Sequence, residues 1–288
     1  MAQQIIYPLS TQPTIRVPPI KTQGIKTKLV QFIRDTINTN GVTRWVEPFL
    51  GSGVVAFNIK PKKALMGESN PYIINFYKAI QDGVISAKMV REYLSKEGNL
   101  LEVCGEKHYY SIRERFNRTH NPLDFLFLNR AGFNGLIRFN SKGGYNVPFC
   151  RKPKRFSKSY ITKITNQVAW IESILCGNMK WKLLSSDWRD VVRQTNKGDF
   201  IYLDPPYSGR DTNYYSAWGN DDLKDLARFL SSTECRFGLS LWYENRYRKN
   251  EDVDHLFGGF HIHKHEHFYH VGATENLRNS ITEVLITN

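Results

Sequence analysis

The sequence predicts an α/β protein with a largely parallel sheet, helices on both of its faces, and a mainly helical insertion. Strand and helix patterns alternate in the N-terminal and C-terminal parts of the chain, whereas the segment between them has helical periodicity. With 288 residues and 41% hydrophobic content, the chain can bury a proper interior. We therefore expect a Rossmann-like core that folds unaided.

The N-terminal part predicts a βαβα unit. Residues 44–48 form the first expected strand, after which Gly51-Ser52-Gly53 turns the chain into a short helix from Val54 to about Ile59. A second strand over residues 64–68 leads through Asn70-Pro71 into an amphipathic helix. The apolar positions of this helix follow helical spacing and are Ile73, Ile74, Tyr77 and Ile80.

The middle of the chain predicts a helical insertion that contains a glycine-rich, hairpin-like loop. Helical patterns cover residues 86–97, 106–118, 122–130 and 157–176, and the loop spans residues 140–145. The predicted domains are therefore a core of residues 1–83 and 178–288 and an insertion of residues 84–177.

The C-terminal part returns to alternating strands and helices. An apolar strand over residues 200–204 is followed by a helix over 221–230, with leucine or alanine at helical spacing, and by a strand over 236–241. This alternation again favours parallel strands covered by helices.

Charge is concentrated in the insertion. The formal charge is +13, and the segment from Phe125 to Ile171 contains no Asp or Glu. Nine Lys or Arg residues and several aromatic residues alternate within it. A merely solubilising surface would normally mix in acids, so this block favours nucleic acid as the partner.

Four cysteines lie far apart, without a Cys-x-x-Cys pair, so the pattern indicates neither a disulfide scaffold nor a zinc site. No apolar stretch approaches 18 residues, and Met1 to Pro19 lacks a charged segment followed by a hydrophobic block. We therefore expect a soluble cytoplasmic protein that does not bind membranes.

The segment Asp204-Pro205-Pro206-Tyr207 follows the apolar strand. The prolines fix φ and supply no N–H groups, so that carbonyls are held facing outward. A carboxylate and a carbonyl that accept from one NH2 group, above an aromatic face, would hold a planar amine for attack on an electrophile. The alternative is an ordinary proline turn after a strand.

A second motif, Glu47-Pro48-Phe49-Leu50-Gly51-Ser52-Gly53, lies at a strand-to-helix turn. Glycines there let a ligand approach the backbone and the free N–H groups of the next helix, although such turns are also simple connections. Glu68 ends the next strand, where an acid can accept from ribose hydroxyls. Because Ala56 takes the place of the third glycine of the dinucleotide fingerprint, a phosphate-free nucleoside cofactor fits better.

These motifs, in their order along the chain, resemble those of Dam-like DNA adenine-N6 methyltransferases of the D12 class. The most specific match is residues 128–140, which continue to Tyr145-Asn146-Val147-Pro148-Phe149 and resemble the recognition hairpin of GATC-type enzymes. Residues 19–26 resemble the cofactor segment of the family and Asp187-Trp188 its acidic-aromatic pair, although Asp187 could also simply cap a helix.

The resemblance implies a site-specific adenine methyltransferase that transfers a methyl group from S-adenosylmethionine to an adenine flipped out of duplex DNA. The implied catalytic residues are Asp204, Pro205 and Tyr207. The implied cofactor-binding residues are Lys21, Lys26, Glu47, Phe49, Gly51, Gly53, Glu68, Asp187 and Trp188. The implied DNA-binding residues are Arg130, Phe133, Asn134, Leu136, Arg138, Asn140, Pro148, Arg151, Lys154 and Arg155.

Within that set, Arg138 would contact the first guanine of GATC, or of a longer site beginning GAT, and Phe133 would wedge into the space that the adenine leaves. From composition alone, Phe133 fits a buried core position better. A restriction nuclease is a conceivable separate partner, and action as a monomer suits flipping of a single base.

Two positions depart from the family pattern. Thr22 stands where the family often has Trp, and Ser240-Leu241-Trp242 stands where Ser-Asn is expected. Of His261, His263, His265, His267 and His270, the first four would share one side of a strand, but alternate positions on an open face rarely form the tetrahedron that zinc needs. We therefore expect no metal, and place this strand near the DNA.

Three rival functions stay open. A cytosine-N4 methyltransferase would use similar amine chemistry, but usually has Ser in place of Asp204. A glutamine-modifying protein methyltransferase would normally have Asn there and no acid-free basic block. A non-catalytic DNA-binding regulator would need neither Glu68 nor the proline motif, and would bind no cofactor.

Overall fold

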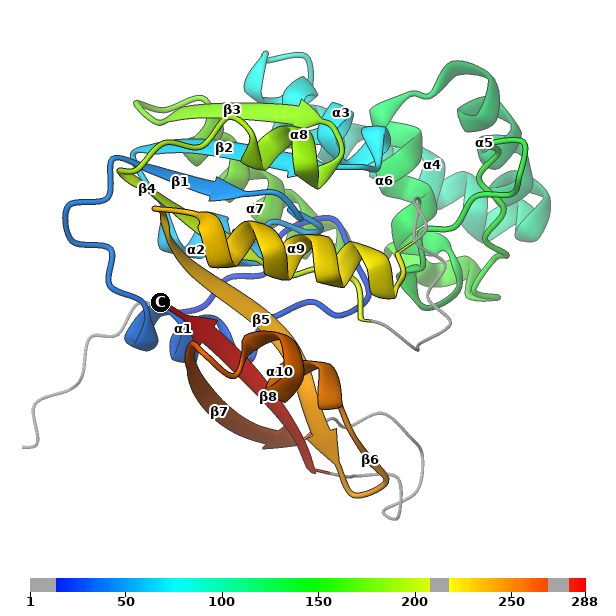
Figure 1. Ribbon diagram of the computed structural model, residues 1–288. Helices are drawn as coiled ribbons and strands as arrows, with labels where there is room; N and C mark the ends of the chain where they lie inside the picture. The colour runs from blue at the N-terminus through cyan, green and yellow to red at the C-terminus, as the bar shows by residue number, and fades with distance from the viewer. Residues whose placement is uncertain (1–13, 208–217, 269–279) are drawn as a thin grey trace, which may run out of the picture.

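The computed structural model describes residues 14–207, 218–268 and 280–288. Its strands are β1 (Arg44–Glu47), β2 (Lys63–Glu68), β3 (Lys180–Ser185), β4 (Asp199–Leu203), β5 (Arg236–Asn245), β6 (Arg248–Lys249), β7 (His261–Phe268) and β8 (Ser280–Thr287). They form one sheet in the order β3-β2-β1-β4-β5-β8-β7, with β6 paired to β5 (Figure 1). Strands β1 to β5 run parallel to one another, whereas β6 and β8 pair antiparallel with β5, and β7 pairs antiparallel with β8. The predicted, largely parallel sheet is confirmed.

Helices cover both faces of the sheet because successive strand residues point to opposite sides. On β1, Trp45 belongs to one hydrophobic core and Val46 to the other; on β4, Phe200 and Ile201 divide in the same way. The first core includes α1 (Val30–Thr36), α2 (Val54–Ile59), α3 (Pro71–Gln81) and α7 (Lys158–Leu175). The second core includes α8 (Trp188–Val192), α9 (Asn220–Ser232) and α10 (Glu251–Phe257).

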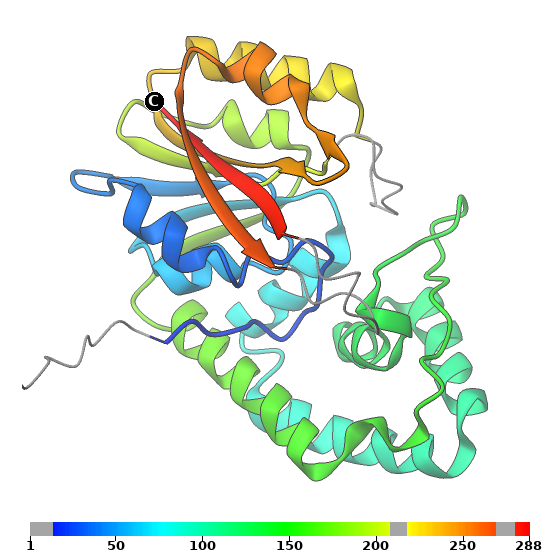
Figure 2. The same ribbon diagram turned by 90° about the horizontal axis from the view of Figure 1, so that it is seen from below.

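The middle segment consists of α4 (Ala87–Cys104), α5 (Glu106–Thr119) and α6 (Pro122–Ala131), and lies to one side of the sheet (Figure 2). The side chain of Ser86 caps α4, and that of Asn121 caps α6. The predicted end of the first of these helices at Glu97 is too early. The helix continues through Gly98, where a Cβ atom would lie 2.7 Å from that of Phe156, so the glycine permits close helix packing.

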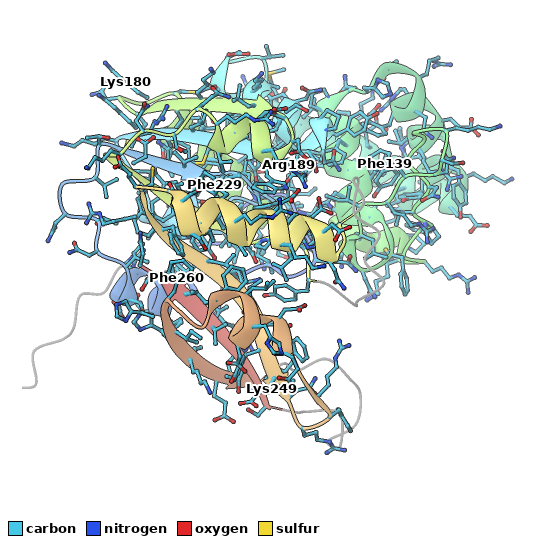
Figure 3. The ribbon with its side chains drawn as sticks, in the orientation of Figure 1. Phe139, Lys180, Arg189, Phe229, Lys249 and Phe260 are labelled. Atoms are coloured by element: carbon cyan, nitrogen blue, oxygen red, sulfur yellow. The ribbon has the colours of Figure 1, made fainter. Side chains whose placement is uncertain are left out.

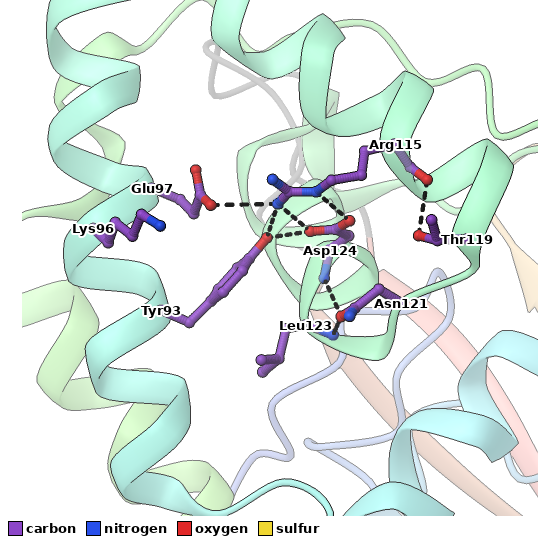
Figure 4. A pocket seen from close by; sticks show the side chains of 8 residues that line it. All are labelled: Tyr93, Lys96, Glu97, Arg115, Thr119, Asn121, Leu123 and Asp124. Atoms are coloured by element: carbon purple, nitrogen blue, oxygen red, sulfur yellow. Dashed lines mark hydrogen bonds and ion pairs between the residues drawn. The ribbon is translucent and has the colours of Figure 1, made fainter.

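Buried charges hold α4, α5 and α6 together (Figure 4). Arg115 on α5 donates to both oxygens of Asp124 on α6, at 2.6 and 2.8 Å, and reaches Glu97 on α4 at 3.3 Å. The hydroxyl of Tyr93 donates to Asp124 as well. Asp124 and Glu97 are only 1% and 4% exposed, and the guanidinium contacts both of these buried acids; Nε2 of His108 also lies 2.8 Å from Glu97.

In the part of the chain that the structure describes, no helix is both long enough and apolar enough to cross a lipid bilayer.

Candidate active site

Asp204 lies directly after β4, at the carboxyl edge of the parallel strands. Strand β4 pairs with β1, whose other neighbour is β2, so the strand order reverses between β1 and β4. Ligands of open α/β sheets bind at such a point, beyond the carboxyl ends of the strands. Pro205 is buried, whereas Asp204 and Tyr207 keep partial exposure. The proline motif is therefore held rigidly at the edge where a ligand can enter.

The ammonium group of Lys26 contacts this motif. Its Nζ atom lies 2.8 Å from Oδ1 of Asp204 and 3.2 Å from the carbonyl oxygen of Gly24. The same atom lies 4.7 Å from the centre of the Tyr207 ring. A carboxylate, a carbonyl and an aromatic face thus surround one group of N–H donors. Lys26, predicted among the cofactor-binding residues, contacts the predicted catalytic acid.

Electrostatics at this pair favour ionisation of both partners near neutral pH. Burial raises the pKa of Asp204 to about 6, although the Lys26 ammonium acts in the opposite direction. Burial disfavours the Lys26 ammonium, but Asp204, with smaller contributions from Tyr207, Glu283 and Tyr202, outweighs that effect, so the pKa of Lys26 is raised. Glu283, a buried residue of β8, adds to both shifts. Sequence patterns gave no signal for Glu283, because it lies within an ordinary apolar strand.

The glycine turn after β1 lies beside Glu68. Gly51 and Gly53 have φ values of 50° and 72°, which favour glycine, and Gly53 is the N-cap of α2. The Gly51 N–H donates to Oε2 of Glu68 at 2.8 Å, and the Asn70 N–H donates to Oε1 at 2.9 Å. Glu68 is nevertheless partly exposed, so its carboxylate can still accept from a ligand hydroxyl.

Glu47, also predicted to bind the cofactor, points into the core beside the catalytic motif. It is buried and accepts a hydrogen bond from the Trp45 indole at 2.9 Å. Burial raises the pKa of Glu47 to about 8, so the carboxyl group is largely protonated at neutral pH. In this form it can also donate a hydrogen bond.

Three aromatic rings meet next to the glycine turn. Phe49 stacks on Trp188 at 6.1 Å between ring centres, and the edge of Trp218 meets Phe49 at 5.4 Å. The sequence indicated Phe49 and Trp188 but missed Trp218, which precedes α9 and lacks a recognisable motif. Asp187 caps α8 by accepting from the Arg189 N–H, as the structural alternative predicted.

Both indole nitrogens of this group, Nε1 of Trp188 and of Trp218, are buried and have no hydrogen-bond partner in the described residues. Leaving such a donor unbonded costs about 1–3 kcal/mol. These features together fit a nucleoside. The aromatic rings and their unbonded indole N–H groups can contact the base, and the half-buried Glu68 carboxylate beside the glycine turn can accept from ribose hydroxyls.

The loop between α6 and α7 presents an exposed aromatic side chain. Phe133 is 50% exposed, in contrast to the core position that composition alone favours. Its neighbour Asn134 is exposed as well and has a φ of 52°. Antiparallel bridges join Gly132 to Phe149 and Phe139 to Tyr145, which confirms the hairpin-like character of the loop. Pro148 is exposed on this hairpin, whereas Leu136 packs partly against the core.

Arg138 is braced within the hairpin. Its Nε atom donates to Oδ1 of Asn146 at 2.8 Å, and its Nη2 atom donates to the carbonyl oxygen of Asn146 at 3.1 Å. The other N–H groups of the guanidinium have no partner in the described residues, so they can bind a ligand. Asn140 uses its Oδ1 atom to shape the loop, accepting from the N–H groups of Lys142 and Gly144.

Of the predicted DNA-contacting arginines, Arg130 is buried and Arg155 is partly exposed. Arg130 is 3% exposed and donates to Gln167 at 2.5 Å, so its side chain does not reach the surface and that prediction needs correction. Arg155 donates to the Arg130 carbonyl at 2.9 Å and to the Tyr160 hydroxyl at 3.0 Å. Arg151 and Lys154, by contrast, are exposed.

Lys21 contacts the loop that follows α6. Its backbone N–H donates to the Asn129 side chain at 2.8 Å, and its aliphatic stem packs against Gly135. The next residue, Thr22, approaches the turn, since its hydroxyl lies 3.8 Å from where a Cβ atom of Gly51 would be. Thr22 therefore borders the predicted cofactor loop.

The histidine strand β7 pairs with β8 at the sheet edge. His265 stacks on Phe32 of α1 at 4.6 Å, and His263 shares a hydrogen bond of 3.0 Å with Thr287. His267 lies 3.7 Å from Glu283. Among the described residues, no group of three or more potential ligands could hold a metal ion, and His270 lies outside them.

A family model described as D12 class N6 adenine-specific DNA methyltransferase matches residues 23–271. Type II methyltransferase M.MjaIII of Methanocaldococcus jannaschii is 29% identical over 274 residues, which cover 86% of this chain and 90% of the relative. Type II methyltransferase M1.LlaDCHI of Lactococcus lactis subsp. cremoris is 27% identical, with 94% and 95% covered. A DNA adenine methylase of Vibrio cholerae is 31% identical, with 69% and 71% covered.

Proposed function

This chain belongs to the D12 class of N6 adenine-specific DNA methyltransferases, and from this we propose that it methylates adenine within GATC, or a longer site beginning GAT, using S-adenosylmethionine. The observation that carries the proposal is the arrangement around the Lys26 ammonium. Asp204, the Gly24 carbonyl oxygen and the face of Tyr207 already surround N–H donors there; for the adenine, the Pro205 carbonyl would take the place of the Gly24 carbonyl. An adenine amine offers the same kind of donor above the same kind of ring.

The proposed chemistry requires an extruded base. The N6 lone pair of adenine is delocalised into the ring, so the amine is a poor nucleophile. By accepting from its two N–H bonds, Asp204 and the Pro205 carbonyl would localise that lone pair, while Tyr207 stacks on the ring. Alignment and preset dipoles then supply most of the acceleration. The amine becomes more acidic as it is methylated, so solvent can take the proton afterwards.

The cofactor would lie between the glycine turn and the aromatic group. Glu68 would accept from the ribose hydroxyls, and Phe49 with Trp188 would flank the adenine ring, whose amine would donate to Asp187. Gly51 and Gly53 would allow the cofactor to approach the backbone closely. Lys26 and Glu47 would lie beside the methyl group that is transferred, next to Asp204. Bound there, S-adenosylmethionine supplies an electrophilic methyl group on a sulfonium.

DNA would lie against the helical insertion, residues 84–177. Phe133 would enter the stack as the adenine leaves, offsetting an unstacking cost of a few kcal/mol. Asn134, Leu136, Asn140 and Pro148 would contact nearby nucleotides, and Arg151 and Lys154 the phosphates. We propose that the protein acts as a monomer, because one base is flipped at a time. Relatives named for type II systems support a separate restriction nuclease as its counterpart.

The rate of methyl transfer is expected to fall as the pH drops through about 6. Asp204 accepts an N–H bond of the adenine amine well only when it is ionised, and its pKa is about 6. The carboxylate is present above that pH and is lost below it, so single-turnover rates should be about tenfold lower at pH 5 than on the plateau. A rate that stays constant down to pH 5 would contradict this assignment.

Replacement of Lys26 by methionine is expected to move this acid limb to higher pH. The ammonium lowers the pKa of Asp204, so its removal leaves the effect of burial unopposed. The pH dependence of the single-turnover rate measures the shift. Lys28→Met, on the same segment but exposed, is the matched control and should keep the wild-type profile.

Arg138→Ala is expected to relax the preference for guanine at the first position of the site. The free N–H groups of Arg138 can bind O6 and N7 of guanine, a contact that discriminates by about 1–3 kcal/mol. Ratios of kcat/KM on duplexes that differ at this base should therefore fall by about ten- to a hundredfold. Lys142→Ala, exposed on the same loop, serves as control. Unchanged ratios for Arg138→Ala would remove it from recognition.

The proposal as a whole is tested by expressing the protein in cells that lack DNA methylation and mapping modified bases along the genome. N6-methyladenine confined to GATC, or to a longer site beginning GAT, is the expected result. N4-methylcytosine, or methyladenine in unrelated sequences, would overturn the corresponding part of the proposal. Calorimetry with S-adenosylmethionine tests cofactor binding separately.

A further inference from the structure

Strand β5 continues well past the edge at which the catalytic motif lies. Its pairing with β4 ends at Leu239, opposite Leu203, but its pairing with β8 continues to Asn245, opposite Ile281. The chain then turns and returns through β6, so that a hairpin projects from the sheet on the side toward which the parallel strands point (Figure 1). At about 3.3 Å per residue, the turn lies roughly 20 Å beyond the catalytic edge.

We propose that the hairpin tip, Arg246, Tyr247 and Arg248, binds the DNA backbone in the duplex that flanks the target site. This inference rests on the proposed function, because it needs DNA at the catalytic edge. It assigns to the core a second contact surface, separate from the helical insertion. At about 3.4 Å per base pair, a reach of roughly 20 Å corresponds to about six base pairs.

The tip is ordered by its own hydrogen bonds. Oδ1 of Asn245 accepts from the N–H groups of Tyr247, at 2.9 Å, and of Arg248, at 3.1 Å. Beyond β6, Asn250 donates to the carbonyl oxygen of Trp242 at 2.9 Å. The hairpin is thus anchored on Trp242, which is buried in β5. An arm held in one conformation loses little entropy when it binds.

Its side chains suit phosphate. The guanidinium of Arg246 lies 4.5 Å from the centre of the Tyr247 ring, and that of Arg248 lies 4.8 Å from Trp242. Neither arginine forms an ion pair with any residue that the structure describes. Guanidinium groups are weakly hydrated, stack on aromatic rings and bind phosphate through paired N–H groups. Both cations are therefore oriented and available.

Two acids near the hairpin, Asp254 and Glu251, are paired with Lys249 rather than with the arginines. Lys249 lies 2.5 Å from Asp254 and 4.0 Å from Glu251, so it compensates two acids at the start of α10. Tyr247 itself is 68% exposed. An exposed aromatic between two unpaired arginines fits a sugar-phosphate backbone better than an apolar partner.

The test compares two duplexes that contain the same target site, one of about 12 and one of about 30 base pairs. Arg246→Gln/Arg248→Gln should bind the long duplex about five- to tenfold more weakly than wild type. The slope of the logarithm of the binding constant against the logarithm of the salt concentration should become shallower by about one to two. Its affinity for the short duplex, and its kcat at saturating DNA, should be unchanged.

Lys63→Gln/Lys180→Gln is the matched control. Both lysines are exposed and pair across β2 and β3 at the opposite edge of the sheet; Figure 3 labels Lys180 and Lys249 near the two ends. This variant should bind both duplexes like wild type. Arg246→Ala repeats the test without disturbing Trp242, because the Arg246 guanidinium stacks on Tyr247.

Wild-type affinity and salt dependence of both arginine variants on the long duplex would overturn the inference. So would an equal loss on both duplexes, or an equal loss in the lysine control. The proposed function fails in a different way, through absence of methyladenine from DNA treated with the wild-type protein.

Discussion

Asp204→Ala is expected to lower methyl transfer by more than about a thousandfold while leaving DNA affinity within a few-fold of wild type. Without the carboxylate, nothing localises the lone pair of the adenine amine or aligns it with the methyl group. Transfer of labelled methyl groups in single-turnover experiments measures the first effect, and fluorescence anisotropy with labelled duplex measures the second. Turnover that persists in this variant would refute the role of Asp204.

Asp204→Asn is the closer comparison, because it keeps the size of the side chain and one carbonyl acceptor. It introduces an NH2 group that repels both the adenine amine and Lys26, so transfer should again be nearly lost. Since Lys26 is buried and bound to Asp204, thermal unfolding of each variant should be recorded as well. A folded but inactive Asp204→Asn protein separates loss of chemistry from loss of structure.

Arg115→Leu is expected to lower the free energy of unfolding by about 3–5 kcal/mol. Removal of the guanidinium leaves Asp124 buried without its cation, and a buried charge that loses its partner destabilises by roughly this amount. Burial and the neighbouring carboxylates of Asp124 and Glu97 raise the pKa of the Tyr93 hydroxyl, so Tyr93 stays neutral and supplies Asp124 with a hydrogen bond but with no positive charge. Urea unfolding of the full chain measures the change.

Arg118→Leu, an exposed change in the same helix, is the control and should alter stability by less than about 0.5 kcal/mol. Combining Arg115→Leu with Asp124→Leu should recover part of the loss, because the unpaired carboxylate is then absent. No recovery in the double variant would mean that packing, rather than charge, dominates at this site. Because α6 leads directly to Phe133, we expect the single Arg115→Leu variant to bind DNA more weakly too.

Much of the candidate site could be predicted from residues that lie close together in the chain. The proline motif after β4, the glycine turn after β1 and Glu68 after β2 are each marked by local sequence. Parallel strands then bring their carboxyl ends to one edge. Side chains whose position depends on distant contacts gave no such signal, which is why Arg130 was expected on the surface.

The sequence by itself determined the alternation of strands and helices, the helical insertion and the order of the motifs, because backbone periodicity, capping and proline geometry act over a few residues. Only the tertiary structure decided that Lys26 binds Asp204, that Arg130 is buried, that Trp218 joins Phe49, and that β5 extends into an arm. These features depend on packing and burial between segments far apart in the chain, and local patterns carry no information about which buried charges meet.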